Sequence, residues 1–413
     1  MNLKHIAIFG NKLSVKGKFI QDLLAGSSFD ELEDFQGKKG LLFSEVVLTK
    51  YLEEDYRHGK SAINKKGNRP LSTFSSGERR KALLEYQLKQ TPDFLILDNP
   101  FDSLDKASVA QLRERLKEIS EEIPIIQIFK READLLPFVT MIFEIQKEKI
   151  VGKYSGNNFK KVASENTYTN LAKIPKPALA FKEIPDILVD FKEVSLSYEG
   201  KPILKDISWQ IKKGDFWQLS GPNGSGKSTL LSMIFGDNPK AYGEDLYLFG
   251  NKKGSGESVW ELKRKIGYFS LALTELFNRR DTVLEMLISG MVDSVGLYRR
   301  PGDKQKRIAR GWLKVLALEQ KEKAIFTKLS ALEQRLVLIA RAMIKHPPLL
   351  ILDEPTTALD DKSAKYIVQL INHIAKESNT AIIYVSHRRE PGLEPKAVYR
   401  LVPSEKGSIG EIV

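Results

Sequence analysis

Cysteine is missing from the chain, and no stretch of apolar residues is long. None of the 413 residues is cysteine, which excludes disulfides, cysteine-ligated zinc and iron–sulfur clusters and fits a reducing compartment. No apolar run approaches the roughly 18 residues that a membrane-spanning helix needs. The stretch "IAIFG" near the start is too short for the apolar part of a secretory signal. We therefore expect a cytoplasmic protein.

The remaining composition is that of a globular protein with a basic surface. Hydrophobic residues make up 42% and charged residues 29% of the chain, and its length predicts two or three domains. The formal charge of +12 fits either a generally basic exterior or an anionic partner such as RNA or a membrane surface. The first reading is the more common, and the dense basic segment at residues 297–314 keeps the second open.

The chain contains an internal sequence repeat. Residues 75–105 align without a gap to residues 330–360 at a constant offset of 255, and "FLILDNPFDSLD" matches "LLILDEPTTALD" at seven of twelve positions. Each copy reads as a polar entry, an amphipathic helix, a turn and a buried strand. A second apolar strand follows each copy, at residues 123–129 and 381–386. This rhythm predicts an α/β fold with parallel sheets and crossover helices, once in each of two domains.

A polar segment separates the two copies. Residues 154–186 contain three prolines and no sustained apolar period, which is typical of a linker, and a flexible linker of this length would reach roughly 30 Å. We therefore predict a first domain at residues 1–153, a linker at 154–186 and a second domain at 187–413.

The second domain contains a phosphate-binding loop between an apolar strand and an apolar helix. The pattern G-x-x-x-x-G-K-[ST] begins at Gly221. Its glycines let the backbone N–H groups point at phosphate oxygens, at the positive end of the following helix. Lys227 can reach the β- and γ-phosphates of a nucleotide, and Ser228 can ligate Mg²⁺. The expected nucleotide-binding residues of this loop are Gly221, Pro222, Asn223, Gly224, Ser225, Gly226, Lys227, Ser228 and Thr229.

Three further residues of the second domain suit phosphate chemistry. Asp353 ends a buried strand, where a carboxylate is costly unless it faces a cation or hydrogen-bond donors, so we expect it to join Ser228 at Mg²⁺. Glu354 can orient and polarise an attacking water, and His387, after the next strand, can contact the γ-phosphate. We therefore expect an ATPase that uses Mg²⁺, with Glu354 and His387 as its catalytic residues.

These residues resemble the motifs of the ABC-type ATPases. "GPNGSGKST" is similar to the Walker A motif, "LLILDEP" to Walker B, "TALD" to the D-loop and "SH" at 386–387 to the switch histidine. More narrowly, residues 203–239 and 243–270 resemble the tandem molybdate-transport or photorepair-type ATP-binding proteins. The resemblance covers nearly the whole chain and implies two ABC cassettes that sandwich ATP, with Tyr198 stacking on the adenine.

In the family, the Walker motifs of one cassette meet the signature and D-loop of the other. The second signature, "LSALE", has Ala331 and Leu332 where the family has two glycines, and Leu332 would crowd a backbone that must approach phosphate. The first signature is intact in these positions. The first-cassette residues expected at the nucleotide are Ser75, Ser76, Gly77, Glu78 and Asp105.

The first cassette has lost its own catalytic parts. Asn99 stands where the catalytic glutamate belongs, Lys130 where the histidine belongs, and Phe19 where the magnesium hydroxyl belongs, in a phosphate loop ("GNKLSVKGKF") two residues too long. The first cassette is also shorter, since Gly17 precedes Gly77 by 60 residues whereas Gly226 precedes Leu332 by 106. We expect the loss in the antiparallel and helical parts, with no strand for adenine stacking.

Pairing the two cassettes in trans predicts one complete site and one degraded site. The complete site combines the second Walker motifs and switch histidine with the first signature and D-loop, inside a single chain that we expect to be monomeric. ATP would drive domain closure. The expected use of this closure is transport, of the molybdate type that the resemblance implies, beside a separate permease at the inner face of the membrane. The family's glutamine after "IGYFS" is replaced in the neighbourhood of Ser270 and Leu271, which weakens that expectation.

Two alternatives remain open. One is a tandem ABC protein that clamps on RNA or the ribosome, which the positive charge favours and the short linker disfavours. The other is a module that only senses ATP, which would leave Glu354 without a task.

Overall fold

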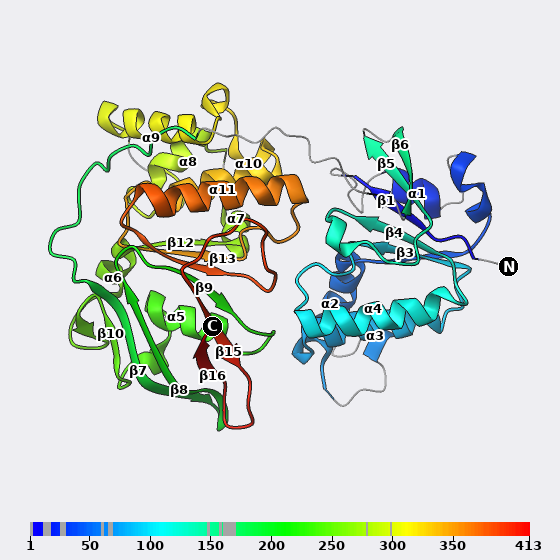
Figure 1. The fold of residues 1–413 in the computed structure, drawn as a ribbon, viewed down its shortest axis with the longest axis horizontal. Coiled ribbons are helices and arrows are strands. Elements are labelled where there is room, and N and C mark those ends of the chain that lie inside the picture. Colours follow the sequence, from blue (N-terminus) through cyan, green and yellow to red (C-terminus); the bar gives the residue numbers. More distant parts are fainter. Residues whose placement is uncertain are drawn as a thin grey trace. The chain divides into compact units, whose positions relative to one another are not determined.

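The chain folds into two compact units in the computed structural model (Figure 1). Unit 1 is Met1–Glu165 together with Ala358–Asp361, and unit 2 is Asn166–Thr357 together with Lys362–Val413. The division therefore falls inside the segment expected to be a linker. The residues that the structure describes are 3–10, 18–24, 30–58, 62–64, 69–146, 149–156, 159, 171–277, 280–297 and 300–413.

Unit 1 is built on a six-stranded sheet with the order β2-β3-β4-β1-β5-β6. All neighbours in it are parallel except β5 and β6, which are antiparallel. β6 continues two residues past the predicted end of the first domain. The strands are β1 (Ile6–Phe9), β2 (Gly40–Phe43), β3 (Phe94–Asp98), β4 (Ile125–Phe129), β5 (Met141–Gln146) and β6 (Lys149–Ser155).

The central strands of unit 1 are apolar on both sides because helices cover both faces of the sheet. Successive strand residues point to opposite faces, so Ala7 and Phe9 pack in one apolar cluster and Ile6 and Ile8 in another. Three helices lie on the first face and α1 on the second (Figure 1). The helices are α1 (Lys18–Leu24), α2 (Glu45–His58), α3 (Ser76–Leu88) and α4 (Lys106–Ser120).

Unit 2 contains the same six-stranded arrangement and a second sheet. The order β12-β13-β14-β9-β15-β16 matches unit 1 strand for strand, including the antiparallel last pair, and the sheet β11-β10-β7-β8 is antiparallel. The strands are β7 (Ile187–Tyr198), β8 (Lys201–Lys212), β9 (Phe216–Ser220), β10 (Leu246–Leu248), β11 (Asn251–Lys252), β12 (Ile266–Ser270), β13 (Leu349–Asp353), β14 (Ala381–Val385), β15 (Ala397–Val402) and β16 (Ile409–Ile412).

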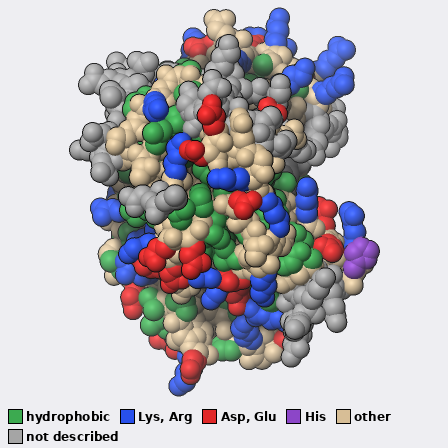
Figure 2. Space-filling model, turned by 90° about the vertical axis from the view of Figure 1, so that its right-hand side faces the viewer, with side chains coloured by type: hydrophobic (Ala, Val, Ile, Leu, Met, Phe, Trp, Pro, Cys, Tyr) green, Lys and Arg blue, Asp and Glu red, His purple; other side chains and the backbone are tan. Residues whose placement is uncertain are grey.

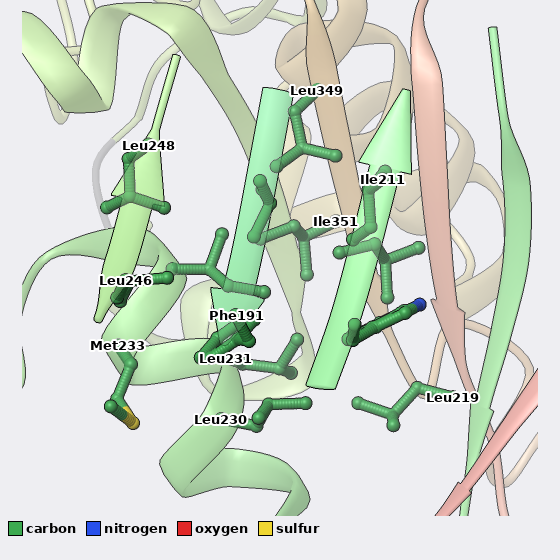
Figure 3. Close-up of a cluster of buried hydrophobic side chains, with 14 of the residues drawn as sticks. Phe191, Ile211, Leu219, Leu230, Leu231, Met233, Leu246, Leu248, Leu349 and Ile351 are labelled. Atoms are coloured by element: carbon green, nitrogen blue, oxygen red, sulfur yellow. The ribbon is translucent and has the colours of Figure 1, made fainter. Parts of the chain in front are cut away.

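The helix that follows β9 lies between the two sheets of unit 2 (Figure 1). Its residues Leu230, Leu231 and Met233 share one apolar cluster with Ile211 of β8 and Ile351 of β13 (Figure 3). This packing on both sides fixes the start of the helix relative to the ends of the parallel strands. The helices of unit 2 are α5 (Lys227–Phe235), α6 (Val259–Lys265), α7 (Leu271–Leu276), α8 (Val283–Ser289), α9 (Asp303–Val315), α10 (Ala331–Met343) and α11 (Asp361–Glu377).

The two copies of the repeat also share unusual backbone conformations. Residues other than glycine rarely adopt a positive φ, yet three such positions in one copy match three in the other at the sequence offset of 255. The pairs are Thr91 (φ 45°) with His346 (51°), Asn99 (45°) with Glu354 (51°), and Ser103 (60°) with Ala358 (60°).

Unit 1 is the shorter cassette, as expected. Its described residues contain no counterpart of the sheet β11-β10-β7-β8, and α2 and α3 stand between β2 and β3 where unit 2 has α7 to α10 between β12 and β13. Among the residues that the structure describes, no helix is long and apolar enough to cross a bilayer.

The second half of the expected linker is bound to unit 2. His373 Nε2 on α11 donates to the carbonyl oxygen of Ala172 at 3.0 Å, and His346 Nε2 donates to that of Pro175 at 2.7 Å. Lys304 Nζ on α9 donates to Ala178 O at 2.9 Å. We call residues 171–178 the strap. This part of the expected linker is thus attached to unit 2, although its sequence is polar and contains prolines.

Candidate nucleotide site

The loop after β9 follows a path that only glycine allows at two positions. Gly226 caps α5 with φ +90°, and a Cβ there would lie 2.7 Å from Leu204 Cδ2. Gly221 has φ +151°, and a Cβ would lie 2.6 Å from Ser225 Oγ and 2.8 Å from Leu401 O. The two glycines therefore set the curvature of the loop, as the spacing of the motif predicts.

The loop forms a cradle suited to an anion. Lys227 Nζ donates to the carbonyl oxygens of Gly221 (2.9 Å) and Pro222 (2.8 Å), so its ammonium group lies inside the curve of the loop. The buried Ser225 hydroxyl has no hydrogen-bond partner among the described residues. The loop meets α5 at the positive end of the helix, where phosphate groups bind. The remaining motif residues are Asn223 and Gly224 in the loop and Ser228 and Thr229 in the first turn of α5.

Two carboxylates and a histidine lie where β13 and β14 end. Asp353 is the last residue of β13, and Glu354 follows it with φ +51°. Glu354 Oε1 lies 2.7 Å from His387 Nε2, and Glu354 Oε2 accepts a hydrogen bond from Thr357 Oγ1 at 3.0 Å. The Glu354 amide donates to Val385 O at 3.0 Å, which ties the two loops together. Both carboxylate oxygens of Glu354 are thus held in place.

The two adjacent carboxyl groups have opposite pKa shifts. Burial and the negative charge of Glu354 raise the pKa of Asp353 to about 6, against the opposing charges of Lys227 and His387. Burial alone would raise the pKa of Glu354, but the hydrogen bond and charge of His387 and the bond from Thr357 hold it below its ordinary value. The pKa of Glu354 is therefore held below its ordinary value beside a neighbour whose pKa is raised, and a cation near Asp353 would favour the ionised form of that carboxylate.

The donor set at Asp353 fits Mg²⁺ bound with a nucleotide. Ser228 and Asp353 line one cavity, and a hydroxyl and a carboxylate are both oxygen donors. The described residues contain no group of three or more His, Cys, Asp or Glu that could hold a metal alone. Mg²⁺ takes one or two protein oxygens and completes its shell with phosphate and water oxygens, so these two residues suffice when a nucleotide supplies the rest.

Tyr198 ends β7 with its ring partly exposed. Asn238 Nδ2 donates to the Tyr198 hydroxyl at 2.9 Å and to Ser232 Oγ of α5 at 3.2 Å, and Lys240 Nζ lies 5.4 Å from the ring centre. Tyr198 is 39% exposed, so a flat base can reach its ring and stack on it. Asn238 links this ring to the helix that carries the phosphate loop.

The signature segment of unit 1 forms the start of α3. Ser75 Oγ accepts from Glu78 N at 3.2 Å, and Glu78 Oε2 accepts from Ser75 N at 2.7 Å, a reciprocal capping box. Ser76 and Gly77 lie in the first turn, and a Cβ on Gly77 would lie 2.7 Å from Ser108 Oγ. Asp105 caps the neighbouring helix by accepting from Ser108 N at 2.8 Å. The starts of α3 and α4 are therefore packed together.

Unit 2 builds the same helix start with different side chains. Ser330 and Glu333 form the same capping box at the start of α10. The difference between the two signatures thus lies in Ala331 and Leu332, whose side chains stand where the first signature has Ser76 and Gly77.

The degraded positions of unit 1 keep the backbone of their counterparts. Asn99 has φ +45°, its amide donates to Ile128 O at 3.0 Å, and its Nδ2 donates to Asp98 Oδ1 at 2.6 Å. Lys130 follows β4 as His387 follows β14. Residues 11–17, which hold most of the first phosphate loop, lie outside the described residues, and Phe19 lies in α1.

The motif reading missed four residues that lie at or beside the candidate site. Thr357 binds Glu354, Asn238 binds Tyr198, and Tyr268, whose pKa burial and the Asp353 charge raise to about 12, lines the cavity beside Asp353. Thr356 is the fourth, through Glu390. The paired threonines directly after "DEP" were a usable signal, whereas the other residues stand in no motif.

Comparison with known proteins follows the same division of the chain. The family described as "ABC transporter" matches residues 204–357. The chain is 37% identical over 341 residues to the "ABC transporter ATP-binding protein ModF" of Escherichia coli K12, and the match covers 78% of this chain and 68% of that protein. The chain belongs to the ABC transporter ATP-binding family.

A second relative and two solved structures are also similar to this chain, the structures in fold alone. An uncharacterized ABC transporter ATP-binding protein of Schizosaccharomyces pombe is 30% identical, with 77% of this chain and 65% of that protein covered. The solved structure titled "RNase-L Inhibitor" shares the fold at a TM-score of 0.62 and 17% identity, covering 98% of this chain and 85% of that one. The structure of an archaeal ribosome recycling factor, solved with a ribosomal stalk protein, shares the fold at a TM-score of 0.61 and 16% identity. The chain spans about two thirds of the length of its curated relatives.

Proposed function

We propose that the protein hydrolyses ATP at one composite site. Unit 2 contributes the phosphate loop, Asp353, Glu354 and His387, and unit 1 contributes the Ser75 signature and the D-loop with Asp105. The observation that carries the proposal is that both carboxylate oxygens of Glu354 are held in unit 2, one by His387 and one by Thr357, while the counterpart of Glu354 in unit 1 is an amide.

Each residue has a defined task in this reaction. The loop N–H groups and Lys227 bind phosphate oxygens, and Tyr198 stacks on the base. Glu354 orients a water and accepts its proton as the water oxygen bonds to the terminal phosphorus and the bond to ADP breaks, while His387 donates to a phosphate oxygen. Ser228 and Asp353 would hold Mg²⁺, which would supply positive charge to offset the negative charge of the phosphates.

Two serines at matching positions test the composite site. Ser75 and Ser330 both cap their helices through the same box, so replacing either with arginine costs a similar cap, about 1 kcal/mol. We expect Ser75→Arg to abolish ATP hydrolysis and Ser330→Arg to leave it within about twofold of wild type. Equal losses in steady-state ATPase rate would refute the composite site.

Nucleotide stoichiometry gives an independent test. In a Glu354→Gln variant, which keeps the shape of the side chain and removes its charge, we expect one tightly bound ATP per chain by equilibrium dialysis. Two tightly bound ATP molecules per chain would show that the first cassette binds nucleotide productively.

The coupled process is proposed to involve a partner that docks on unit 2. A cavity of about 580 Å³ opens beside Ser228 and Asp353 and is lined by Trp260 and Val292. Trp260 is 75% exposed and Val292 60%, and exposed apolar side chains around a cavity are typical of a protein contact. A partner bound there would sense the magnesium end of the site, which fits a separate permease in transport at the inner face of the membrane, with the protein in the cytoplasm where ATP is available.

Association with RNA or the ribosome is the alternative, and charge gives it limited support. On the face that Figure 2 shows, Lys and Arg side chains are interspersed with Asp and Glu and do not gather in one patch. The basic segment at 297–314 contains α9, whose Arg310 pairs with Glu322 and whose Lys304 binds the strap. Co-sedimentation with ribosomes that is lost at high salt would support this alternative; retention of a membrane protein by wild type but not by Trp260→Asp would support the permease.

A further inference from the structure

A buried carboxylate lies three residues beyond His387. Glu390 is 4% exposed, and its Oε1 accepts a hydrogen bond from Thr356 Oγ1 at 2.7 Å. The Thr356 oxygen is also 3.1 Å from the hydroxyl of Tyr384 on β14. Thr356 and Tyr384 are fully buried. A carboxylate is placed in such an environment only where its hydrogen bonds repay the loss of water, and none of the reaction steps above uses it.

The contact joins the two loops that carry the reacting groups. Thr356 comes two residues after Glu354, and Glu390 three residues after His387. The loop after β14 has no regular structure over residues 386–390, so side-chain contacts contribute to where His387 lies. We infer that Glu390 is a positioning residue, which acts through Thr356 to hold the His387 loop against the Glu354 loop. This inference rests on the proposed function, in which Glu354 and His387 act on ATP.

Unit 1 offers an internal comparison. Asn99 N donates to Ile128 O as Glu354 N donates to Val385 O, which aligns Lys130 with His387 and Ala133 with Glu390. At the offset of the first loop, Phe101 aligns with Thr356. The unit without a catalytic pair therefore also lacks the Thr–Glu pair.

Unit 1 holds the corresponding loop in another way. Gln127 of β4 stands where Tyr384 stands in β14, and its amide donates to Asp134 O at 2.7 Å and accepts from Leu136 N at 2.9 Å. A loop of this kind can thus be tied to its own strand without a buried carboxylate. The Thr–Glu pair is thus found in the unit that carries the catalytic pair, and the fold itself does not require it.

The test compares Glu390→Gln, Thr356→Val and the double variant with Glu394→Gln, an exposed glutamate in the same region. We expect kcat to fall about 10- to 100-fold in both single variants, because a displacement of about 1 Å can cost that much. KM for ATP should stay within about twofold, since the phosphate loop and Tyr198 are untouched. The double variant should be no slower than the slower single variant, as for two residues of one contact.

A second readout does not depend on hydrolysis. In nucleotide-free protein with ¹³Cε1-labelled histidine, the His387 signal is identified by its loss in His387→Gln. We expect this signal to shift in Glu390→Gln and Thr356→Val and to stay in place in Glu394→Gln. An unchanged His387 signal, or a loss of thermal stability with kcat unchanged, would overturn the inference. A wild-type protein without ATPase activity would instead refute the proposed function, and the spectra would still decide the positioning role.

Discussion

Replacing Asn99 with glutamate restores the Walker B motif of the first cassette. The variant tests whether the first cassette lacks ATPase activity only because it lacks a catalytic base. We expect the variant to gain no ATPase activity and to lose stability. Asn99 has a left-handed backbone (φ +45°), which asparagine tolerates better than glutamate does. The change also removes the bond from Asn99 Nδ2 to Asp98 Oδ1 and puts a second carboxylate beside Asp98, whose pKa burial already raises.

The size of the loss follows from these contacts. The backbone preference is worth up to about 1 kcal/mol and the amide bond about 1 kcal/mol, so with the added charge we expect about 1–3 kcal/mol of destabilisation. In a domain of this size that lowers the melting temperature by about 2–12 °C. Differential scanning calorimetry and a coupled ATPase assay on the same preparation measure both effects.

The reverse change serves as the matched control. Glu354→Asn gains the residue preferred by the backbone at φ +51° but loses the contacts of Glu354 with His387 and Thr357, so we expect it to abolish hydrolysis at a net cost of about 1 kcal/mol. The reasoning fails if Asn99→Glu more than doubles the ATPase rate, or if it melts at the wild-type temperature.

Three further outcomes are expected. Gly226→Ala should weaken ATP binding by at least tenfold in equilibrium binding, because its Cβ would meet Leu204 at 2.7 Å in a left-handed backbone; unchanged affinity would contradict the loop geometry. Tyr198→Ala should raise KM for ATP about fivefold or more with little change in kcat, whereas Tyr198→Phe should not, since stacking uses the ring. His5 accepts from Ile125 N at Nδ1 and burial lowers its pKa, so stability should be full above pH 6.5 and fall as pH drops through the lowered value; a melting temperature equally pH-dependent in His5→Gln would exclude this source.

The fold was largely predictable because it depends on short-range patterns. The strand ending in Asp353, the helix with buried Leu336 and Ile339, and the glycine spacing of the phosphate loop each express a local periodicity or backbone requirement. The internal repeat then predicts that the two units share one fold, and the matching strand orders of their six-stranded sheets confirm this prediction.

The parts that sequence reasoning missed depend on contacts between distant residues. Glu390 lies 34 residues from Thr356 in the sequence, and no motif in either segment predicts that the two side chains are in contact. In the strap, Ile174 is a single buried apolar residue with 8% exposure. One such residue creates no repeating apolar pattern from which its burial could be predicted. The role of the first signature stays a prediction, since it concerns the pairing of two units and not the local structure of one.

The strap has a practical consequence for work on the second cassette alone. Pro175 fills the space over Gly311, where a Cβ would lie 2.6 Å from the proline ring, and the strap also engages His346 and His373. A fragment that starts at residue 187, where the domain pattern begins, would uncover this surface of α9 and leave two histidines without their carbonyl acceptors. Protein intended for crystallisation or binding assays should therefore retain the chain from before Leu171, or poor solubility would be mistaken for an intrinsic property of the cassette.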